Sequence, residues 1–237
     1  MKTYLDAILA FHRERARVDT RSFPDLFNLA SQASPCRGFA QAIARESQSR
    51  LSVIAEIKRR SPSKGNLNID VDPAVLALQY EQGGATCLSV LTDVEHFAGS
   101  PEDLRIARGS VGLPVLRKDF TVDLRDICDA RLMGADAVLL IAAALTGAEM
   151  ASFHEVATSL GLDVLVEVHD ERELEVALTA NASMIGVNQR DLVTFQVDHE
   201  RAVRMAGVIP EHAVKVAESG VRGADDARSL RRAGYDA

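Results

Sequence analysis

Polar and charged side chains follow five apolar, strand-like runs of this sequence, each directly after the run ends. The clusters are Glu56-Ile57-Lys58, Lys118-Asp119-Phe120, Glu167-Val168-His169, Asn188-Gln189-Arg190-Asp191 and Glu218-Ser219-Gly220. Lysines and carboxylates are side chains that perform general acid–base catalysis. One charged residue after a strand means little, but five such ends at a similar spacing indicate one pocket built from many strand tips. This is the layout of a (β/α)8 barrel, whose active site lies at the carboxyl ends of its strands.

Side chains two residues apart in a strand share one face of the sheet, and this alternation indicates which polar groups face the same way. Glu56 and Lys58 share a face of the first strand, and Leu116 and Lys118 share a face of the third. We therefore expect each polar cluster to cap a column of inward-facing apolar side chains.

The two lysines at strand ends are candidate proton donors and anion-binding groups. In a crowded cationic pocket the pKa of a lysine falls toward neutrality, and we expect this of Lys58 and Lys118. Glu56 and Glu167 are candidate bases or proton shuttles. The alternative is structural: each lysine forms a salt bridge at the rim, and the two glutamates neutralise the lysines. Both interpretations can hold together.

The fourth and fifth clusters favour binding of an anionic, hydroxylated ligand. Asn188 offers a donor and an acceptor to a hydroxyl group, and Arg190 can bind a phosphate or carboxylate through two hydrogen bonds. Ser219 and Gly220 precede a helix whose N-terminus favours anions, and phosphate sites after the last strands are common in barrels. The alternatives are an Asx turn at Asn188 and a surface ion pair between Arg190 and Asp191.

The loop after the first strand, Arg59-Arg60-Ser61-Pro62-Ser63-Lys64-Gly65, is basic and rich in hydroxyl groups. Such a loop can act as a lid over an anionic substrate, and the alternative is a solvated basic loop. His169 lies two residues after Glu167 and is expected to have a structural role. The six histidines show no spacing typical of metal ligands, so no metal site is predicted.

The composition is that of an ordinary globular protein, with 237 residues, 26% of them charged, and a net charge of −7. The acidic balance argues against a nucleic-acid surface, so an anionic ligand needs a local basic pocket. Cys36, Cys87 and Cys128 show neither CxxC nor metal-type spacing and are expected to be reduced thiols. The N-terminus has no apolar signal core and no window approaches membrane-spanning length, so we expect a cytoplasmic protein.

Two regions are expected in one chain. Residues 1–50 are predicted to form an N-terminal helical extension, because Tyr4, Ile8 and Phe11 or His12 fall on one helical face. Pro24 and Pro35 divide the region. Residues 51–237 are predicted to form a single barrel domain.

From residue 51 the sequence alternates between strand-like and helical segments, which predicts a parallel sheet buried on both faces. Strands are expected to begin near Val53, Cys87, Pro114, Ala137, Asp163, Met184 and Val214. Helices are expected over 73–82, 101–108, 123–133, 147–160, 170–179, 198–206 and 223–233. Gly234-Tyr235-Asp236-Ala237 is expected to be the loop and first residue of an eighth strand, so the chain is interpreted as ending at the start of that strand.

Segments of this alternating region resemble the indole-3-glycerol phosphate synthase family of tryptophan biosynthesis. They are AEIKRRSPSKG (55–65), FAGSPEDL (97–104), PVLRKDF (114–120), LLIAA (139–143), LVEVH (165–169), IGVNQRDL (185–192) and ESGV (218–221). They occur in the family's order over residues 51–221, and the helical extension also fits. The resemblance implies a (β/α)8 barrel that converts 1-(2-carboxyphenylamino)-1-deoxyribulose 5-phosphate to indole-3-glycerol phosphate, with loss of CO2 and water and without a metal or organic cofactor.

The resemblance also implies a role for each catalytic residue. Lys118 is the general acid that assists attack of the aromatic carbon on the sugar ketone. Glu167 and Lys58 serve later proton transfers, and Glu56 and Asn188 position the substrate and tune the lysines.

Further residues are implied in substrate binding. Glu218 and Ser219 complete the polar wall, and Arg190 and Gly220 meet the phosphate. The other implied substrate-binding residues, mostly apolar, are Ser61, Phe97, Phe120, Leu139, Ile141 and Leu192. The family's Gly-Ser phosphate loop on strand 8 has no counterpart in this sequence, so phosphate binding and barrel closure are expected to be weaker than in the family.

Three alternatives remain open. A Schiff-base aldolase on a similar barrel would use Lys118 as its nucleophile. A phosphosugar isomerase would use one acid and one base for catalysis and would not need both Lys58 and Lys118. A non-enzymatic barrel would act only as a phosphate-binding or interaction module. For partners, the sequence predicts a phosphorylated small-molecule substrate and a monomer or weak oligomer, with other enzymes of the pathway as candidate partners.

Overall fold

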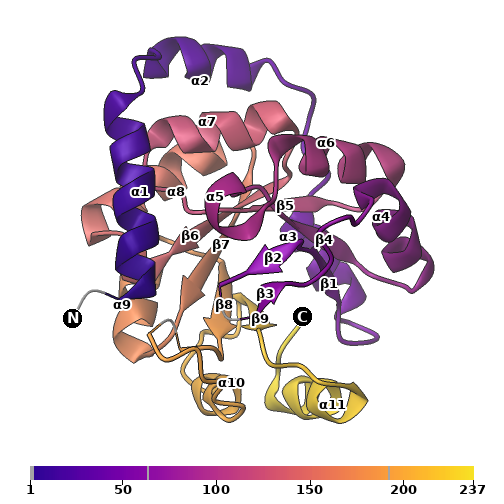
Figure 1. Ribbon diagram of the computed structural model, residues 1–237. Helices are drawn as coiled ribbons and strands as arrows, with labels where there is room; N and C mark the ends of the chain where they lie inside the picture. Colours follow the sequence, from indigo (N-terminus) through magenta and orange to yellow (C-terminus); the bar gives the residue numbers. More distant parts are fainter. Residues whose placement is uncertain (1–2, 63, 192) are drawn as a thin grey trace.

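The fold is built on one curved sheet of seven parallel strands (Figure 1). The structure is a computed structural model that describes residues 3–62, 64–191 and 193–237. In sheet order the strands are β1 (Ile54–Ile57), β4 (Cys87–Leu91), β5 (Val115–Lys118), β6 (Ala137–Ile141), β7 (Asp163–Val168), β8 (Met184–Asn188) and β9 (Val214–Glu218). Every residue of β4, β6 and β8 is buried, as expected of parallel strands covered on both faces. The predicted α/β fold class and the predicted strand positions are confirmed.

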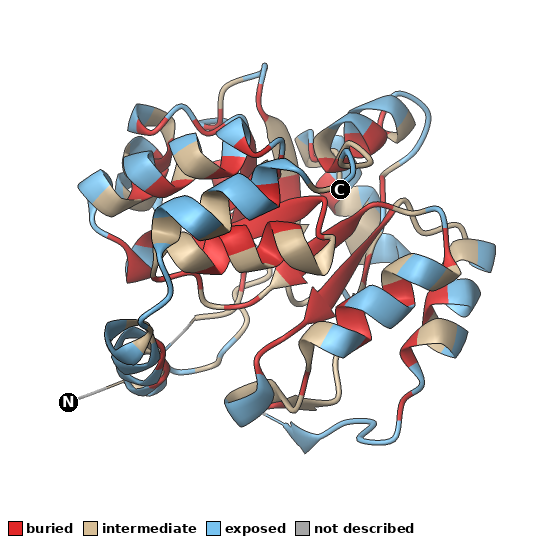
Figure 2. Ribbon diagram, turned by 90° about the horizontal axis from the view of Figure 1, so that it is seen from above, coloured by how far each residue is buried: buried red, intermediate tan, exposed pale blue. Residues whose placement is uncertain are grey.

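Helices follow the strands and cover the outside of the sheet, with their exposed faces turned outward (Figure 2). They are α4 (Pro73–Gln82), α6 (Pro101–Ser110), α7 (Leu124–Met133), α8 (Gly147–Ser159), α9 (Glu171–Thr179), α10 (Arg201–Met205) and α11 (Ala224–Ala233). Local signals set their starts: Asp72 and Ser100 cap helices that begin with proline, and Thr146 forms a capping box with Glu149. All seven predicted helices are present, although α10 is shorter than its predicted range.

Three short elements were not predicted from the sequence. The loop after β1 forms an antiparallel pair, β2 (Arg60–Ser61) with β3 (Gly65–Asn66). Helix α5 (Val94–Phe97) follows β4, and the 3-10 turn η1 (Ala142–Ala144) follows β6. All three lie at the carboxyl ends of strands, so they add structure around the predicted pocket.

Three helices precede β1, namely α1 (Tyr4–Val18), α2 (Phe23–Ser31) and α3 (Phe39–Glu46). Helix α3 closes the amino ends of the strands, where Phe39 and Ile43 are fully buried. The hydroxyl of Ser52 donates to the Ile43 carbonyl, and the Ala40 amide donates to Asp163 at the start of β7. Helix α2 packs on α7, whereas α1 lies along the side of the barrel and reaches its carboxyl end (Figure 1).

The last residues of the chain lie between β9 and the segment before β1. The amides of Asp236 and Ala237 donate to the Lys215 carbonyl on β9, and the Ser52 amide donates to the Asp236 carbonyl at 2.8 Å. Tyr235 is fully buried and its hydroxyl donates to the Ala202 carbonyl. The described residues therefore contain seven complete strands of this sheet, and residues 236 and 237 pair where a further strand would begin. None of the described helices is both long and apolar enough to cross a membrane.

Candidate active site

A cavity of about 510 Å³ opens at the carboxyl ends of the strands. Every predicted site residue that the structure describes lines it. These residues are Glu56, Lys58, Ser61, Phe97, Lys118, Phe120, Leu139, Ile141, Glu167, Asn188, Arg190, Glu218, Ser219 and Gly220. Leu192, the remaining predicted residue, lies outside the described residues. The fold thus brings together side chains that are up to 164 positions apart, from Glu56 to Gly220.

Lys118 lies at the centre of the polar part of the cavity, at the end of β5. Its Nζ donates to Glu218 Oε2 at 2.8 Å and to Glu167 Oε2 at 3.2 Å. The other oxygen of Glu167 accepts a hydrogen bond from Asn188 Nδ2 at 3.0 Å. Four strands, β5, β7, β8 and β9, therefore supply one connected hydrogen-bonded group.

The charge state of Lys118 differs from the sequence-based expectation. Burial disfavours the ammonium, but the carboxylates of Glu218, Glu167 and Glu56 more than offset it, so the pKa of Lys118 lies well above its usual value. The expected lowering was wrong for Lys118 because its closest charged neighbours are carboxylates rather than cations. The side chain of Lys118 is therefore protonated at neutral pH.

The two glutamates beside Lys118 have opposite pKa shifts. Burial raises the pKa of Glu167, but Lys118, His169 and the hydrogen bond from Asn188 outweigh it, and the net shift is downward. Burial and the charge of Glu167 raise the pKa of Glu218 to about 7, although Lys118 opposes this. Of the two buried carboxyl groups, Glu167 is therefore ionised at neutral pH, whereas Glu218 titrates near neutrality.

Gly186 on β8 makes room for Glu218. A Cβ at this position would lie 2.0 Å from Glu218 Oε1 and 3.1 Å from Leu165 Cδ1. Any larger residue would therefore push the Glu218 carboxylate away from its place beside Lys118. The sequence analysis did not single out this glycine, because its close approach is to a residue on the neighbouring strand.

Glu56 and Lys58 form a second polar group at the end of β1. Their side chains make an ion pair and are about one-third exposed at 34% and 28%. The salt bridge that the sequence left open as an alternative is therefore present for this pair. Lys64, from the loop after β1, also lines the cavity and adds a cation to this side.

Asn188 and Arg190 are held by the loop after β8. Asn188 Oδ1 accepts from the Arg190 amide at 2.9 Å, which is an Asx turn, while the side-chain amide still donates to Glu167. Arg190 donates to the Phe195 carbonyl at 3.1 Å. Asp191 instead accepts from the amides of Val193 and Thr194. Within the described residues, the alternative of an Arg190–Asp191 ion pair is thus replaced by a loop that directs the guanidinium along the cavity wall.

The turn after β9 has a left-handed backbone and requires a glycine at position 220. Ser219 and Gly220 have φ of +66° and +73°, and a Cβ on Gly220 would lie 2.5 Å from Val197 Cγ1. The start of α11 is less suited to an anion than expected, since Asp225 and Asp226 lie in its first turn and Asp226 already accepts from the Arg222 amide. An anion on this side would depend on the turn and on Arg190.

The opposite side of the cavity is apolar and aromatic. Phe97 and Phe120 contribute rings whose centroids are 6.2 Å apart, and Leu139 and Ile141 of β6 are almost fully buried beneath them. The cavity therefore has an aromatic side, a basic side and a carboxylate–lysine group between them.

Other lining residues were missed by the sequence analysis. Tyr4, Leu5 and Ile8 come from α1, and Phe195 comes from the loop after β8. Helical spacing had placed Tyr4 and Ile8 on one face of a helix, but spacing alone does not tell which surface that face meets. Ser89 on β4 also lines the cavity, with a buried hydroxyl that has no partner among the described residues.

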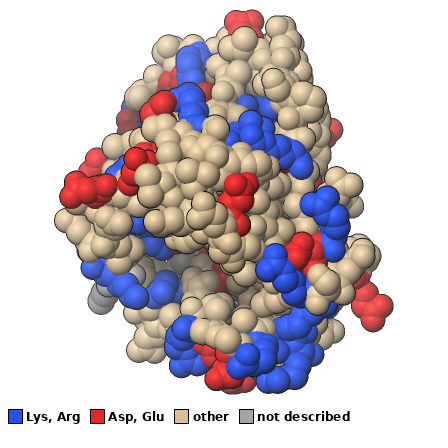
Figure 3. Space-filling view, turned by 90° about the vertical axis from the view of Figure 1, so that its right-hand side faces the viewer, with Lys and Arg blue, Asp and Glu red and all other residues tan. Residues whose placement is uncertain are grey.

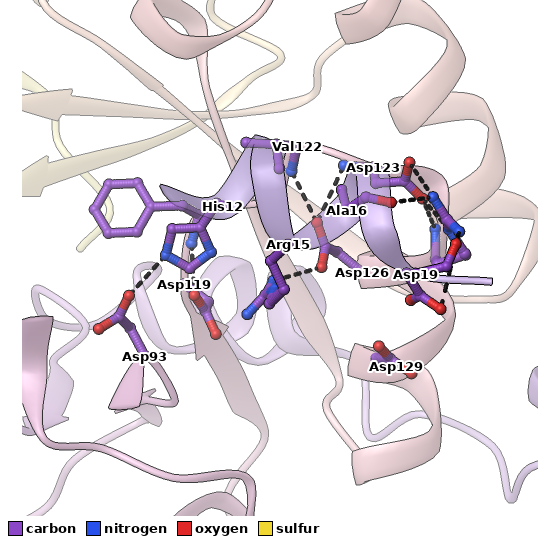
Figure 4. Close-up of polar contacts among 12 residues, drawn as sticks. His12, Arg15, Ala16, Asp19, Asp93, Asp119, Val122, Asp123, Asp126 and Asp129 are labelled. Carbon is purple, nitrogen blue, oxygen red and sulfur yellow. Dashed lines mark hydrogen bonds and ion pairs between the residues drawn. The ribbon is translucent and has the colours of Figure 1, made fainter. Parts of the chain in front are cut away.

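Two histidines that the sequence treated as unrelated, His12 and His96, come together with Asp93 next to the cavity. Figure 4 shows the contact between His12 and Asp93. Ligand atoms of His12, Asp93 and His96 lie within 4.8 Å of one another, a spacing that could hold a metal ion. Spacing along the sequence did not indicate this cluster, because the fold joins residues 81 positions apart. His169, by contrast, bonds Glu173 and lies 3.7 Å from Glu167, behind the cavity wall.

Comparisons with known proteins agree with this geometry. A family model described as "Indole-3-glycerol phosphate synthase" matches residues 5–237. "Indole-3-glycerol phosphate synthase 2" of Streptomyces coelicolor is 51% identical over 92% of this chain and 83% of its own. The "Indole-3-glycerol phosphate synthase" proteins of Arthrobacter sp. and Chlorobium luteolum are 48% and 47% identical over 99% of this chain, and over 88% and 90% of their own. A solved structure described as "Native KDPGal structure" aligns with a TM-score of 0.53 at 14% identity, covering 80% of this chain and 82% of that one, which shows the fold alone.

Proposed function

Because this chain belongs to the indole-3-glycerol phosphate synthase family, we propose that it closes the indole ring of 1-(2-carboxyphenylamino)-1-deoxyribulose 5-phosphate and releases CO2 and water. It is then a carboxy-lyase of tryptophan biosynthesis. The observation that carries the proposal is Lys118, a protonated lysine between two carboxylates, at the boundary of an aromatic and a basic cavity side.

The substrate has three parts that match the three parts of the cavity. Its aromatic ring fits the side formed by Phe97, Phe120 and the aliphatic residues of β6. Its phosphate fits the side with Arg190 and the turn at Gly220, and its carboxylate is within reach of the lysines of the β1 side. The ketone that must react then lies near Lys118, between the two sides.

Lys118 is suited to be the acid of the first step. As the aromatic carbon that bears the carboxylate attacks the ketone carbon, the ketone oxygen takes up a proton, and an ammonium beside it supplies that proton. Loss of CO2 follows, and the new hydroxyl group then leaves as water. Glu167 and Lys58 move the protons of these later steps, and Asn188 holds Glu167 in place through its 3.0 Å hydrogen bond. The C–C bond that forms, the C–C bond that breaks with loss of CO2 and the C–O bond that breaks with loss of water involve no oxidant or reductant, so the catalysis asked of the protein is proton transfer.

The Schiff-base alternative requires a neutral amine as the nucleophile. The three carboxylates around Lys118 favour its charged form, which supports the role of an acid over that of a nucleophile. Borohydride reduction in the presence of substrate distinguishes the two, since only the aldolase mechanism leaves a covalent adduct on Lys118.

The direct test is the appearance of indole fluorescence after addition of the deoxyribulose phosphate. The protein contains no tryptophan, so the signal of the product is not obscured by the protein. No signal from the folded protein at saturating substrate would refute the proposal. We further propose that the protein acts in the cytoplasm as a monomer or weak oligomer, alone or with other enzymes of the pathway, which size-exclusion chromatography at several concentrations tests.

A further inference from the structure

Asp93 lies just beyond the end of β4, where the β4–α5 turn meets α1. Its side chain is only 1% exposed. One oxygen, Oδ1, accepts from the backbone amides of His96 and Phe97 and so caps helix α5. The other, Oδ2, accepts from His12 Nε2 at 2.7 Å (Figure 4), and it also accepts from His96 Nδ1 at 3.0 Å. One carboxylate thus joins α1 to the turn that carries Phe97.

This carboxylate is held in its charged form. Burial disfavours the charge, but the hydrogen bonds from His12 and His96 and the backbone amide outweigh it, so the pKa of Asp93 is well below its usual value. A buried charge of this kind needs its partners, because removal of one leaves the other uncompensated. The contact between Asp93 and His12 therefore fixes α1 more firmly than a surface contact would.

The ion pairs that the arginines of α1 form are at the surface. Arg13 bonds Glu149, and Arg15 bonds Asp126, each at 2.8 Å, but the two arginines are 43% and 45% exposed. Solvent-exposed pairs of this kind contribute little to stability. Among the contacts of α1 with the described part of the chain, the His12–Asp93 pair combines charge with near-complete burial, at 1% for each side chain.

The rings around Asp93 form a continuous aromatic rim, of which Tyr4, Phe97, Phe120 and Phe195 line the cavity. Neighbouring ring centroids are 5.7 Å apart for Phe195 and Tyr4, 6.3 Å for Tyr4 and His96, 6.0 Å for His96 and His12, 5.3 Å for His12 and Phe120, and 6.2 Å for Phe120 and Phe97. Two of these residues belong to α1 and two to α5. The rim therefore depends on how these two helices are held against each other.

We propose that Asp93 is a positioning residue for the reaction: by tying His12 of α1 to the α5 turn, it sets the aromatic rim against which the ring of the substrate packs. This inference rests on the proposed function, which supplies an aromatic substrate. Asp93 does not line the cavity, so it acts through Tyr4, Phe97 and Phe120 rather than on the reacting atoms. Lys118 and its two glutamates have no hydrogen bond to Asp93.

The proposal predicts a change in substrate binding with little change in chemistry. Asp93→Asn keeps the shape of the side chain and an oxygen for the amides of α5, but removes the charge that His12 and His96 share. Loss of a charge-assisted hydrogen bond of this kind corresponds to roughly a tenfold rise in KM, and we expect kcat to stay within about threefold of wild type. Hydrogen exchange of the backbone amides of α1 should quicken, while exchange in β5 should be unchanged.

Asp129→Asn is the matched control. It makes the same charge change and removes the 2.8 Å ion pair with Arg21 in the segment after α1, away from the aromatic rim. KM should be unchanged. A second pair of variants leaves the cap of α5 intact: His12→Ala should reproduce the rise in KM, and His12→Gln, whose amide can take the place of Nε2 as a donor, should restore it. This pair decides the question if Asp93→Asn does not fold.

Three outcomes would overturn the proposal. They are an unchanged KM together with unchanged exchange in α1, a fall in kcat alone, and equal KM values for His12→Ala and His12→Gln. Failure of the proposed function is a different result, namely no product from the wild-type protein. Unchanged exchange of α1 in Asp93→Asn would in that case still refute the anchoring on which the inference depends.

Discussion

Lys118 and its two glutamates form a group in which each charge depends on the other two. The lysine keeps Glu167 ionised, and Glu167 in turn raises the pKa of Glu218. The carboxyl group of Glu218 can therefore hold a proton near neutral pH. A site of this composition can both give and take protons without a change in its overall architecture.

Lys118 can be tested with two substitutions that separate charge from proton release. Lys118→Met removes both, and we expect turnover to fall by about 10²- to 10⁴-fold, the usual contribution of acid catalysis. Lys118→Arg keeps a cation for Glu167 and Glu218 but does not release its proton, so it should be about as inactive. Circular dichroism checks that both variants fold. Turnover by Lys118→Arg above a tenth of wild type would show that Lys118 acts through its charge alone.

Glu167 as a proton shuttle should be more important for turnover than for affinity. Glu167→Gln keeps the shape and an oxygen for the hydrogen bond from Asn188, but it removes the ionisable group. We expect a low kcat with a KM close to that of wild type in steady-state kinetics. If KM alone rises, Glu167 is a binding residue and the proton transfer belongs to another group.

The raised pKa of Glu218 makes the stability of the protein depend on pH. The pKa is about 7 in the folded chain, whereas the ordinary value is 4.5. Between these values the folded chain binds the proton and the unfolded chain does not, so the free energy of unfolding falls as pH rises from about 4.5 through 7. Glu218→Gln removes this titration. Wild type should therefore lose stability relative to Glu218→Gln between pH 4.5 and pH 8 in denaturant titrations, and a constant difference would contradict the assigned pKa.

At the scale of elements, the parallel strands bring the site together and small residues leave it space. Gly186 of β8 lies opposite Val216 and next to Glu167, where a Cβ would collide with the Glu218 carboxylate. The glycine therefore has no local conformational role in the strand. Its lack of a side chain instead leaves room for the Glu218 carboxylate of the neighbouring strand β9.

Gly186→Ala should displace Glu218 from Lys118, and we expect turnover to fall at least tenfold, which corresponds to about 1.4 kcal/mol of transition-state stabilisation. Gly109→Ala on α6 is the control, because a Cβ there meets nothing within 4 Å. Alanine is the better helix former by about 1 kcal/mol, so this variant should be slightly more stable and fully active. Equal activities of the two variants would show that the position of Glu218 does not matter.

At the scale of the whole molecule, an acidic protein must bind a substrate with two anionic groups, a phosphate and a carboxylate, through a local basic region. The net charge is −7, and Lys and Arg side chains are interspersed with Asp and Glu on the face that Figure 3 shows. Inside the cavity, Lys58, Lys64 and Arg190 oppose this overall charge. The attraction between the substrate and these nearby cations must therefore outweigh the repulsion between the substrate and the net negative charge of the protein.

Salt screens both the attraction and the repulsion, but the cavity cations are the charges closest to the substrate and contribute the larger interaction energy. Salt should therefore weaken substrate binding. The Debye length falls from about 10 Å at 0.1 M salt to about 3 Å at 1 M, so KM should rise with ionic strength. Lys64→Gln should raise KM at low salt and flatten its salt dependence. Arg232→Gln, at an exposed position in the last turn of α11, makes the same charge change and should keep the wild-type slope. Identical slopes for all three proteins would show that Lys64 does not contact the substrate.

The sequence by itself determined the strands, the helices that follow them and the polar residues at the carboxyl ends of the strands, whereas the apolar residues of the cavity were expected from the family resemblance. These features depend on local signals, namely apolar runs that must be buried, N-caps such as Asp72 and Ser100, and the rule that parallel strands end at one edge. The short helix α5 and the β2–β3 pair were missed, because their few residues carry no periodic pattern. The roles of the individual site residues stay predictions.

The tertiary structure alone decided the charge states and the long-range contacts. Whether the pKa of Lys118 rises or falls depends on which charged groups neighbouring strands place beside it, and these were carboxylates rather than the expected cations. The contact between His12 and Asp93 spans 81 positions, and Tyr4, Leu5 and Ile8 of α1 line the cavity. Electrostatic interactions and packing depend on distance in space, and a sequence gives only distance along the chain.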